Sequence, residues 1–95
     1  MAETFRLRVM SLMRVLYDDE VKSVFLQGDE GEYELLPFHY PLMGALLNSD
    51  IKIAGADPIT IKCGVVMFDN NSCIIICEEH DTEKMLYGPG GGKTK

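Results

Sequence analysis

Short runs of alternating apolar and polar residues recur about every eight to twelve positions, with turn-forming residues between them. In the first run, Phe5, Leu7 and Val9 alternate with two arginines. Successive side chains of a β-strand point to opposite faces, so this pattern buries one face and leaves the other in water. Many short strands at this spacing are typical of sandwiches and barrels. We therefore predict an all-β domain.

The expected strands follow these runs. They are 5–10, 13–17, 21–27, 32–36, 42–47, 51–53, 59–63, 65–68 and 73–77. The expected turns are 18–20, 28–31, 55–58 and 69–71. Residues 37–41 should be rigid and irregular, because prolines enclose them and proline cannot donate a ladder hydrogen bond. Gly64 should mark a bulge or a bend. The run 73–77 is apolar on both faces, so we expect it inside the sandwich or against a partner.

The pattern changes near the end of the chain. Residues 81–87 allow at most a short helical turn with Asp81 as its N-cap, since Gly88 and a proline follow. We expect a sandwich domain at 1–83, then a short helical remnant and a flexible glycine-rich tail at 84–95. No apolar run reaches the roughly 18–20 residues of a membrane span. The first residues lack a long apolar core and a small-residue cleavage site, so we expect no secretory signal.

The formal net charge is −6, from 9 basic and 15 acidic residues. Such a surface disfavours nucleic acids and anionic membranes as direct partners. The acids gather at 18–20, 29–34 and 78–83. Each group either keeps the domain soluble or forms a docking surface for a basic loop of a partner.

The three cysteines do not form a CxxC motif. Cys73 and Cys77 lie four strand positions apart, about 13 Å, which is too far for a disulfide or a shared metal ion. Cys63 is separate. We expect all three to be small buried apolar residues in a reducing compartment.

No catalytic group of residues emerges from the motifs. The tail resembles a phosphate-binding loop, GxxxxGK[ST], but Tyr87 stands where its first glycine is required. His80 lies among acids, yet adjacent residues on one strand or loop rarely converge on one metal ion. His39 is the other histidine, and nothing in the spacing pairs it with a cysteine. We expect no enzyme activity, no cofactor and no metal.

One segment is unusual in its density of turn formers, acids and aromatics. It reads Gly-Asp-Glu-Gly-Glu-Tyr-Glu-Leu-Leu-Pro-Phe-His-Tyr-Pro-Leu at 28–42 and follows a strand. The sequence at 20–42 resembles the signature of the F-type ATP synthase epsilon subunit, in which a Gly-x-Glu-Gly-Glu turn precedes Leu-Pro-x-His-x-Pro-Leu. Leu16-Tyr17, the apolar run at 45–53, Gly64 and Asp81-Thr82 also fit. The resemblance extends over roughly 4–83.

The resemblance implies a flattened antiparallel β-sandwich of about ten short strands, the N-terminal domain of that subunit. It implies a non-catalytic central-stalk protein that binds the gamma subunit and the c subunits of the membrane rotor ring, coupling them during rotary ATP synthesis. Its place would be peripheral, on the cytoplasmic face of the bacterial inner membrane. The family normally adds a C-terminal pair of helices, which we expect to be missing here. The alternative is a free-standing adaptor of the same family that no longer binds the rotor.

The resemblance also assigns site residues. Contact with the rotor ring falls on the acidic turn at Glu30, Gly31 and Glu32. Contact with gamma falls on Ser11, His39, Leu42 and Met43. The chain departs from the family at Glu34 and Phe38, where glycine is usual, and at Tyr40, where a small residue is usual. Phe38 and Tyr40 should enlarge the apolar surface, and Glu34 should have a backbone conformation open to any residue.

Overall fold

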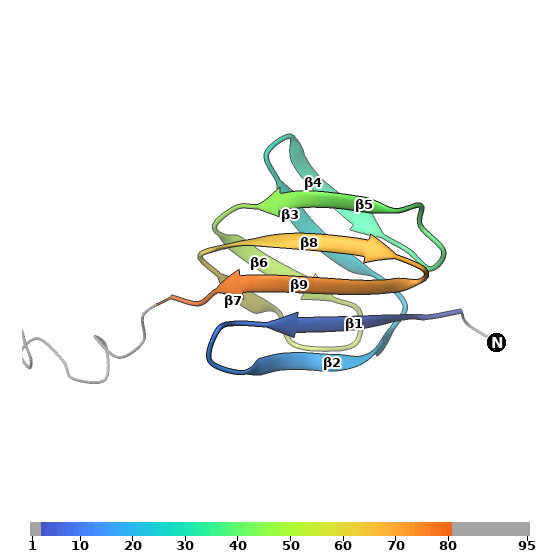
Figure 1. The fold of residues 1–95 in the computed structure, drawn as a ribbon, viewed down its shortest axis with the longest axis horizontal. Coiled ribbons are helices and arrows are strands. Elements are labelled where there is room, and N and C mark those ends of the chain that lie inside the picture. Colours follow the sequence, from blue (N-terminus) through green and yellow to red (C-terminus); the bar gives the residue numbers. More distant parts are fainter. Residues whose placement is uncertain (1–2, 81–95) are drawn as a thin grey trace, which may run out of the picture.

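The computed structural model describes residues 3–80, which form nine strands in two sheets packed face to face (Figure 1). The strands are β1 (Phe5–Met10), β2 (Val15–Val21), β3 (Val24–Gly28), β4 (Gly31–Leu35), β5 (Leu42–Leu46), β6 (Ser49–Ile53), β7 (Ile59–Ile61), β8 (Cys63–Asp69) and β9 (Ser72–Glu78). The all-β prediction is confirmed. The helical turn and tail expected at 84–95 lie outside the described residues.

The larger sheet has the strand order β2-β1-β9-β8-β5, and the smaller has β4-β3-β6-β7. Neighbouring strands run antiparallel except β1 and β9, which pair in parallel at the centre of the larger sheet (Figure 1). The first and last described strands, β1 and β9, therefore lie side by side. The strand expected at 73–77, inside the sandwich or against a partner, is this central strand β9; its inward side chains are buried, while Ile76 on the outer side is 42% exposed.

The core lies between the two sheets and is entirely apolar among the described residues. Alternate side chains of β1 enter it, as the period of two predicts, and Phe5 meets Phe68 edge to face with ring centroids 5.2 Å apart. The core consists of Phe5, Leu7, Val9, Val21, Val24, Leu26, Leu35, Leu46, Ile51, Ile53, Ile61, Val66, Phe68, Cys73, Ile75 and Cys77.

Three expectations about strand limits are wrong. The strand expected at 59–63 ends at Ile61, and Cys63 instead begins β8. The turn expected at 18–20 is part of β2, because Asp18 lies opposite Arg8 and makes an ion pair with Arg6 at 2.7 Å. These cross-strand pairs accommodate acids that are otherwise rare in strands. The strand expected at 21–27 begins only at Val24. Val21 and Val24 are both buried, and a spacing of three breaks the alternation, so the chain bends there to cross between the sheets.

The sequence predicted the turns better than it predicted the strand limits. The β8–β9 hairpin closes through Asn70 and Asn71, with φ of 54° and 56°, as the asparagine-rich sequence predicts. Gly64 is not a bulge, since its register with β9 is continuous. A Cβ atom there would lie 2.8 Å from the carbonyl oxygen of Ile76, so the close approach of β9 requires the glycine. The only register shift recorded between paired described strands falls between Val9 and Met10.

Candidate docking surfaces

The outward side of the larger sheet carries a continuous apolar surface. We call it the outer apolar face; it consists of Met10, Met43, Ala45, Val65, Met67, Ile74 and Ile76. Strand register arranges these residues in two rows. One row runs from Met43 to Met67 and Ile74, and the other from Ala45 through Val65 and Ile76 to Met10. Residues directly opposite on one face touch one another, so the rows form one patch.

Much of this patch is open to water. The exposed fraction is 74% for Met43, 49% for Val65, 41% for Met67 and 42% for Ile76. An antiparallel sheet with one solvated face normally places polar residues on that face. A contiguous exposed apolar patch instead indicates a surface that another molecule covers.

The outward side of the smaller sheet is different. It carries Glu32, Glu34, Asp50, Lys52 and Thr60 around one aromatic residue, Phe25. Glu32 makes an ion pair with Lys52 at 3.3 Å, and Thr60 donates a hydrogen bond to Asp50 at 2.6 Å. Exposed ion pairs of this kind suit a solvated surface. The two faces of the sandwich are therefore unlike, and the larger sheet presents the candidate docking face.

The outer apolar face has a charged margin along β1 and β2. Arg6 and Arg8 both reach the carboxylate of Asp18, at 2.7 and 3.7 Å. Arg8 lies beside Ile74 in the parallel pairing, so it borders the apolar rows directly. Glu20 lies opposite Arg6 in the same register, so two guanidinium groups and two carboxylates alternate along this margin.

The loop between β1 and β2, residues 11–14, projects two apolar side chains from one end of this sheet. Leu12 is 95% exposed and Met13 is 86% exposed. The hydroxyl of Ser11 accepts hydrogen bonds from the backbone N–H groups of Met13 and Arg14, at 3.1 and 3.2 Å, which fixes the turn. Ser11 therefore shapes the loop, and its two neighbours offer the contact area. Sequence reasoning singled out Ser11 and missed them.

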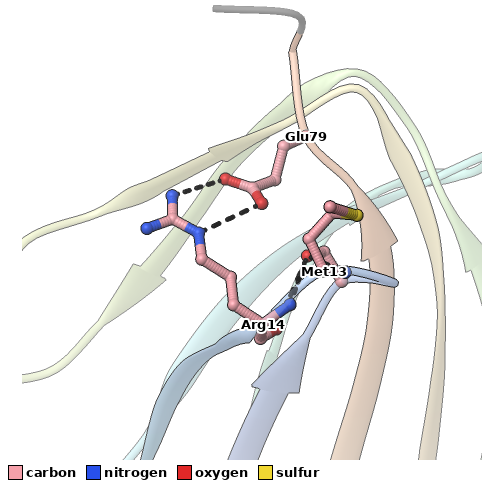
Figure 2. A network of polar contacts seen from close by, with 4 residues as sticks. Met13, Arg14 and Glu79 are labelled. Carbon is pink, nitrogen blue, oxygen red and sulfur yellow. Dashed lines mark hydrogen bonds and ion pairs between the residues drawn. The ribbon is translucent and has the colours of Figure 1, made fainter.

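An ion pair ties this loop to the end of β9. Figure 2 shows the guanidinium of Arg14 facing the carboxylate of Glu79, with N–O distances of 2.8 and 3.3 Å. The hydrogen bond from Arg14 holds the pKa of Glu79 below its usual range, and the same contact raises the pKa of Arg14. A two-point contact of this geometry orients both groups. The position of the loop is thus linked to the residues that leave β9.

The predicted ring contacts come together at the tip of the β3–β4 hairpin. Gly31 has φ of 121°, a conformation reserved for glycine, so the Gly-Asp-Glu-Gly sequence is what allows the tight turn. Glu30 and its neighbour Asp29 are exposed at the tip. Glu32 is one residue into β4 and is paired with Lys52. Glu30 and Asp29, for which the described residues show no ion pair, are therefore both open to an external cation, whereas Glu32 is already paired.

The segment between the two prolines has the irregular backbone that was expected. The ring of His39 lies 4.3 Å from that of Tyr40 and 5.7 Å from that of Phe68, and its Nδ1 is 2.6 Å from the Tyr40 carbonyl oxygen. Packing against aromatic rings orients this histidine. No carboxylate is recorded against it, so the described residues do not form an acid–base pair.

Phe38 has a strained backbone. Its φ is 65°, which is a genuine outlier for a bulky residue, and its side chain is 66% exposed. The side chain of Asn71 accepts a hydrogen bond from the Phe38 N–H at 2.7 Å and donates one to the Thr4 carbonyl at 3.0 Å. The β8–β9 turn therefore holds this segment in place. Tyr40, 74% exposed, adds to the apolar surface, as expected.

The four predicted gamma contacts do not form one cluster. Ser11 lies in the β1–β2 connection, and His39 in the β4–β5 connection at the opposite end of the larger sheet (Figure 1). Met43 is on the outer apolar face between them. Leu42 is partly buried and packs against the core, so its side chain faces inward. A single partner that touched all three outward residues would cover the sheet from end to end.

The cysteines differ from expectation at one position. Cys73 and Cys77 are buried free thiols, but Cys63 is exposed and donates a hydrogen bond to Glu78 at 3.4 Å. Its position in β8 has the same parity as Val65 and Met67, which explains the outward direction. Burial raises the pKa of Cys73 to about 12. Within 3–80, no group of three possible metal ligands is found, and no helix is long and apolar enough to cross a membrane.

Comparison with known proteins gives consistent results. Residues 4–82 match the family described as ATP synthase, delta/epsilon chain, beta-sandwich domain. The chain is 39% identical over 82 residues to the sodium-ion-specific ATP synthase epsilon chain of Acetobacterium woodii, covering 82% of this chain and 62% of that one. It is 35% identical over 79 residues to the epsilon chain of Sulfurovum, covering 77% and 62%. The chain thus spans about three-fifths of the length of these relatives.

Solved structures share the fold at low sequence identity. A chain of the mitochondrial ATP synthase of Euglena gracilis aligns with a TM-score of 0.74 at 18% identity, covering 87% of this chain and 59% of that one. A chain from the central stalk and c-ring of the Tetrahymena thermophila enzyme aligns with a TM-score of 0.69 at 11% identity, covering 98% and 80%.

Proposed function

Because this chain belongs to the ATP synthase delta/epsilon family, through its β-sandwich domain, we propose that it is a non-catalytic subunit of the central stalk. In this role it binds the gamma subunit and the c subunits of the rotor ring and turns with them. It is peripheral to the membrane, on the cytoplasmic side of a bacterial cell membrane, through the complex alone. The observation that carries the proposal is the outer apolar face, which has no counterpart on the smaller sheet.

Gamma is the partner proposed for the outer apolar face. Met43 would contact it directly from the patch. Ser11 would act by holding Leu12 and Met13 at one end, while His39 would act at the other end. Leu42 would contribute by anchoring β5 to the core. Buried apolar contact of this kind supplies most of the affinity in a lasting complex, while the charged margin at Arg8 favours one orientation.

The rotor ring is the partner proposed for the hairpin tip. Glu30 would face basic side chains of the ring loops, Gly31 would keep the turn tight, and Glu32 would share its charge between Lys52 and the ring. Charge pairs at an exposed rim steer association and fix register more than they add affinity. Two separate surfaces, one apolar and one acidic, suit a protein that joins two parts of a rotor.

Binding to gamma can be tested with a matched pair of variants. Val65→Glu places a charge in the outer apolar face, and Phe25→Glu places one at a similarly exposed residue, 49% against 38%, on the smaller sheet. Both proteins should fold, because both side chains point outward. Val65→Glu should lose co-purification with gamma, and Phe25→Glu should keep it. Equal retention of gamma by both variants would contradict the proposal.

The alternative is a free-standing adaptor of the same family. It predicts that the wild-type chain brings down neither gamma nor the ring from cells that contain an assembled ATP synthase. In both readings the isolated protein should not hydrolyse ATP, and turnover that follows the protein through purification would refute both.

A further inference from the structure

The methionines of the described chain all lie on or beside the outer apolar face. Met10, Met43 and Met67 are part of the face, and Met13 is in the adjoining loop. The core contains none, although methionine is well suited to filling core space. The hydrophobic core of the monomer therefore does not account for the positions of these methionines.

The fold leaves these side chains partly open to water and makes two of them direct neighbours. Met43 and Met67 are cross-strand partners on adjacent strands, with side chains 74% and 41% exposed. Met13 is 86% exposed at the loop tip. Met10 is half-buried and lies beside Ile76. A methionine that is accessible to water is also accessible to small oxidants.

We propose that these methionines form an oxidation site that controls docking, an inference that rests on the proposed binding of gamma. A thioether sulfur lone pair attacks one oxygen of hydrogen peroxide, and the O–O bond breaks. The sulfur gains that oxygen as a sulfoxide, and the second oxygen leaves as water with both hydrogens. The sulfur is oxidised by two electrons and the peroxide is reduced by two. Enzymatic reduction of the sulfoxide reverses the change.

Oxidation should weaken docking because a sulfoxide is much more polar than a thioether. A sulfoxide is a strong hydrogen-bond acceptor, and burial against an apolar partner would leave it without a donor. Oxidised protein should therefore dock poorly. Once gamma covers the face, the same sulfur atoms are shielded. The site thus distinguishes free subunit from assembled subunit and prevents assembly under oxidising conditions.

The experiment measures the affinity of the full chain for gamma before and after treatment with hydrogen peroxide. Mass spectrometry counts the sulfoxides. Treated wild-type protein should bind gamma about tenfold more weakly or worse, because polar sulfoxides disrupt methionine-rich interfaces. Treatment with methionine sulfoxide reductases should restore binding. Protein treated while in complex with gamma should carry fewer sulfoxides at Met43 and Met67.

A variant with leucine at Met10, Met13, Met43 and Met67 is the matched control, since the exchange conserves volume and apolar character. Its untreated affinity for gamma serves as its own baseline, and peroxide should leave that affinity unchanged. Both proteins carry Cys63→Ser, which removes the exposed thiol. If oxidised wild-type protein binds as tightly as untreated protein, the inference is wrong while the proposed function stands. If untreated protein does not bind gamma, the proposed function itself fails.

Discussion

The strained backbone at Phe38 gives the sharpest test of the structure. Phe38 and Glu34 are both positions where the resemblance to the epsilon family implies glycine. Their conformations differ: Phe38 has φ of 65°, and Glu34, in β4, is not among the residues with positive φ. Replacing each by alanine and by glycine should therefore give opposite results at the two positions.

The expected difference in the free energy of unfolding between the alanine and glycine variants depends only on the backbone conformation at each position. A left-handed conformation costs a residue with a Cβ atom about 1–2 kcal/mol. Glycine avoids this cost but loses roughly 0.4–1 kcal/mol through the greater freedom of the unfolded chain. At Phe38, the glycine variant should therefore be more stable than the alanine variant by roughly 0.8 kcal/mol, the difference between the midpoints of these ranges. At Glu34 the left-handed cost is absent, so glycine should be less stable than alanine by about 0.5–1 kcal/mol.

The measurement is the free energy of unfolding of all four variants by chemical denaturation, supported by thermal melting. A difference of 1 kcal/mol moves the melting temperature of a domain this size by about 4–8 °C, so the signs are resolvable. If glycine is less stable than alanine at both positions, Phe38 does not have a left-handed backbone and the reasoning fails. In that case backbone strain at Phe38 could not be used as an argument for a role of this residue at a partner surface.

Three further outcomes follow from the turns and charges. Gly31→Val should destabilise the protein by more than about 1 kcal/mol, because valine is excluded at φ of 121°, and an unaltered melting temperature would reject this. Reversal of charge at both Glu30 and Glu32 to lysine should weaken association with the rotor ring while leaving circular dichroism intact, and it should lower the melting temperature only slightly, because the ion pair lost between Glu32 and Lys52 is exposed; unchanged co-purification with the ring would count against the docking role. The pKa of Glu79 is lowered in the folded state, so its contact with Arg14 stabilises the fold above the ordinary glutamate pKa and is lost as pH falls through the lowered value. The stability difference between wild type and Arg14→Met should accordingly vanish on acidification, and a difference independent of pH would show that the ion pair contributes nothing.

Local pattern was enough to predict the fold class and the acidic hairpin. The alternation in β1 placed Phe5, Leu7 and Val9 in the core, and the sequence at 28–31 predicted the turn in which Gly31 has a positive φ. The same rules failed at Asp18, because its partners Arg6 and Arg8 come from another strand and only pairing reveals them. Cys63 was misjudged because the strand expected at 59–63 gave it the parity of the buried Ile61, whereas it begins β8 and shares the outward parity of Val65.

The docking face was harder to foresee because it depends on contacts between distant segments. Met43, Met67, Ile74 and Met10 come from four strands, and only the sheet order β1-β9-β8-β5 makes them neighbours. Phe38 is similar, since its left-handed backbone is held by Asn71 of another hairpin. Within one strand, each of these residues looks like an ordinary exposed apolar side chain.

The parallel pairing of β1 with β9 also bears on how the protein is made. During synthesis, β1 and β2 can form a hairpin early, but the other edge of β1 has no partner until residues 72–76 have left the ribosome. Until then it is an open strand edge beside unburied Phe5 and Leu7, the kind of surface that chaperones bind. Contacts this distant in sequence also slow folding. The nascent chain should therefore become resistant to proteases in one late step, when β9 inserts between β1 and β8.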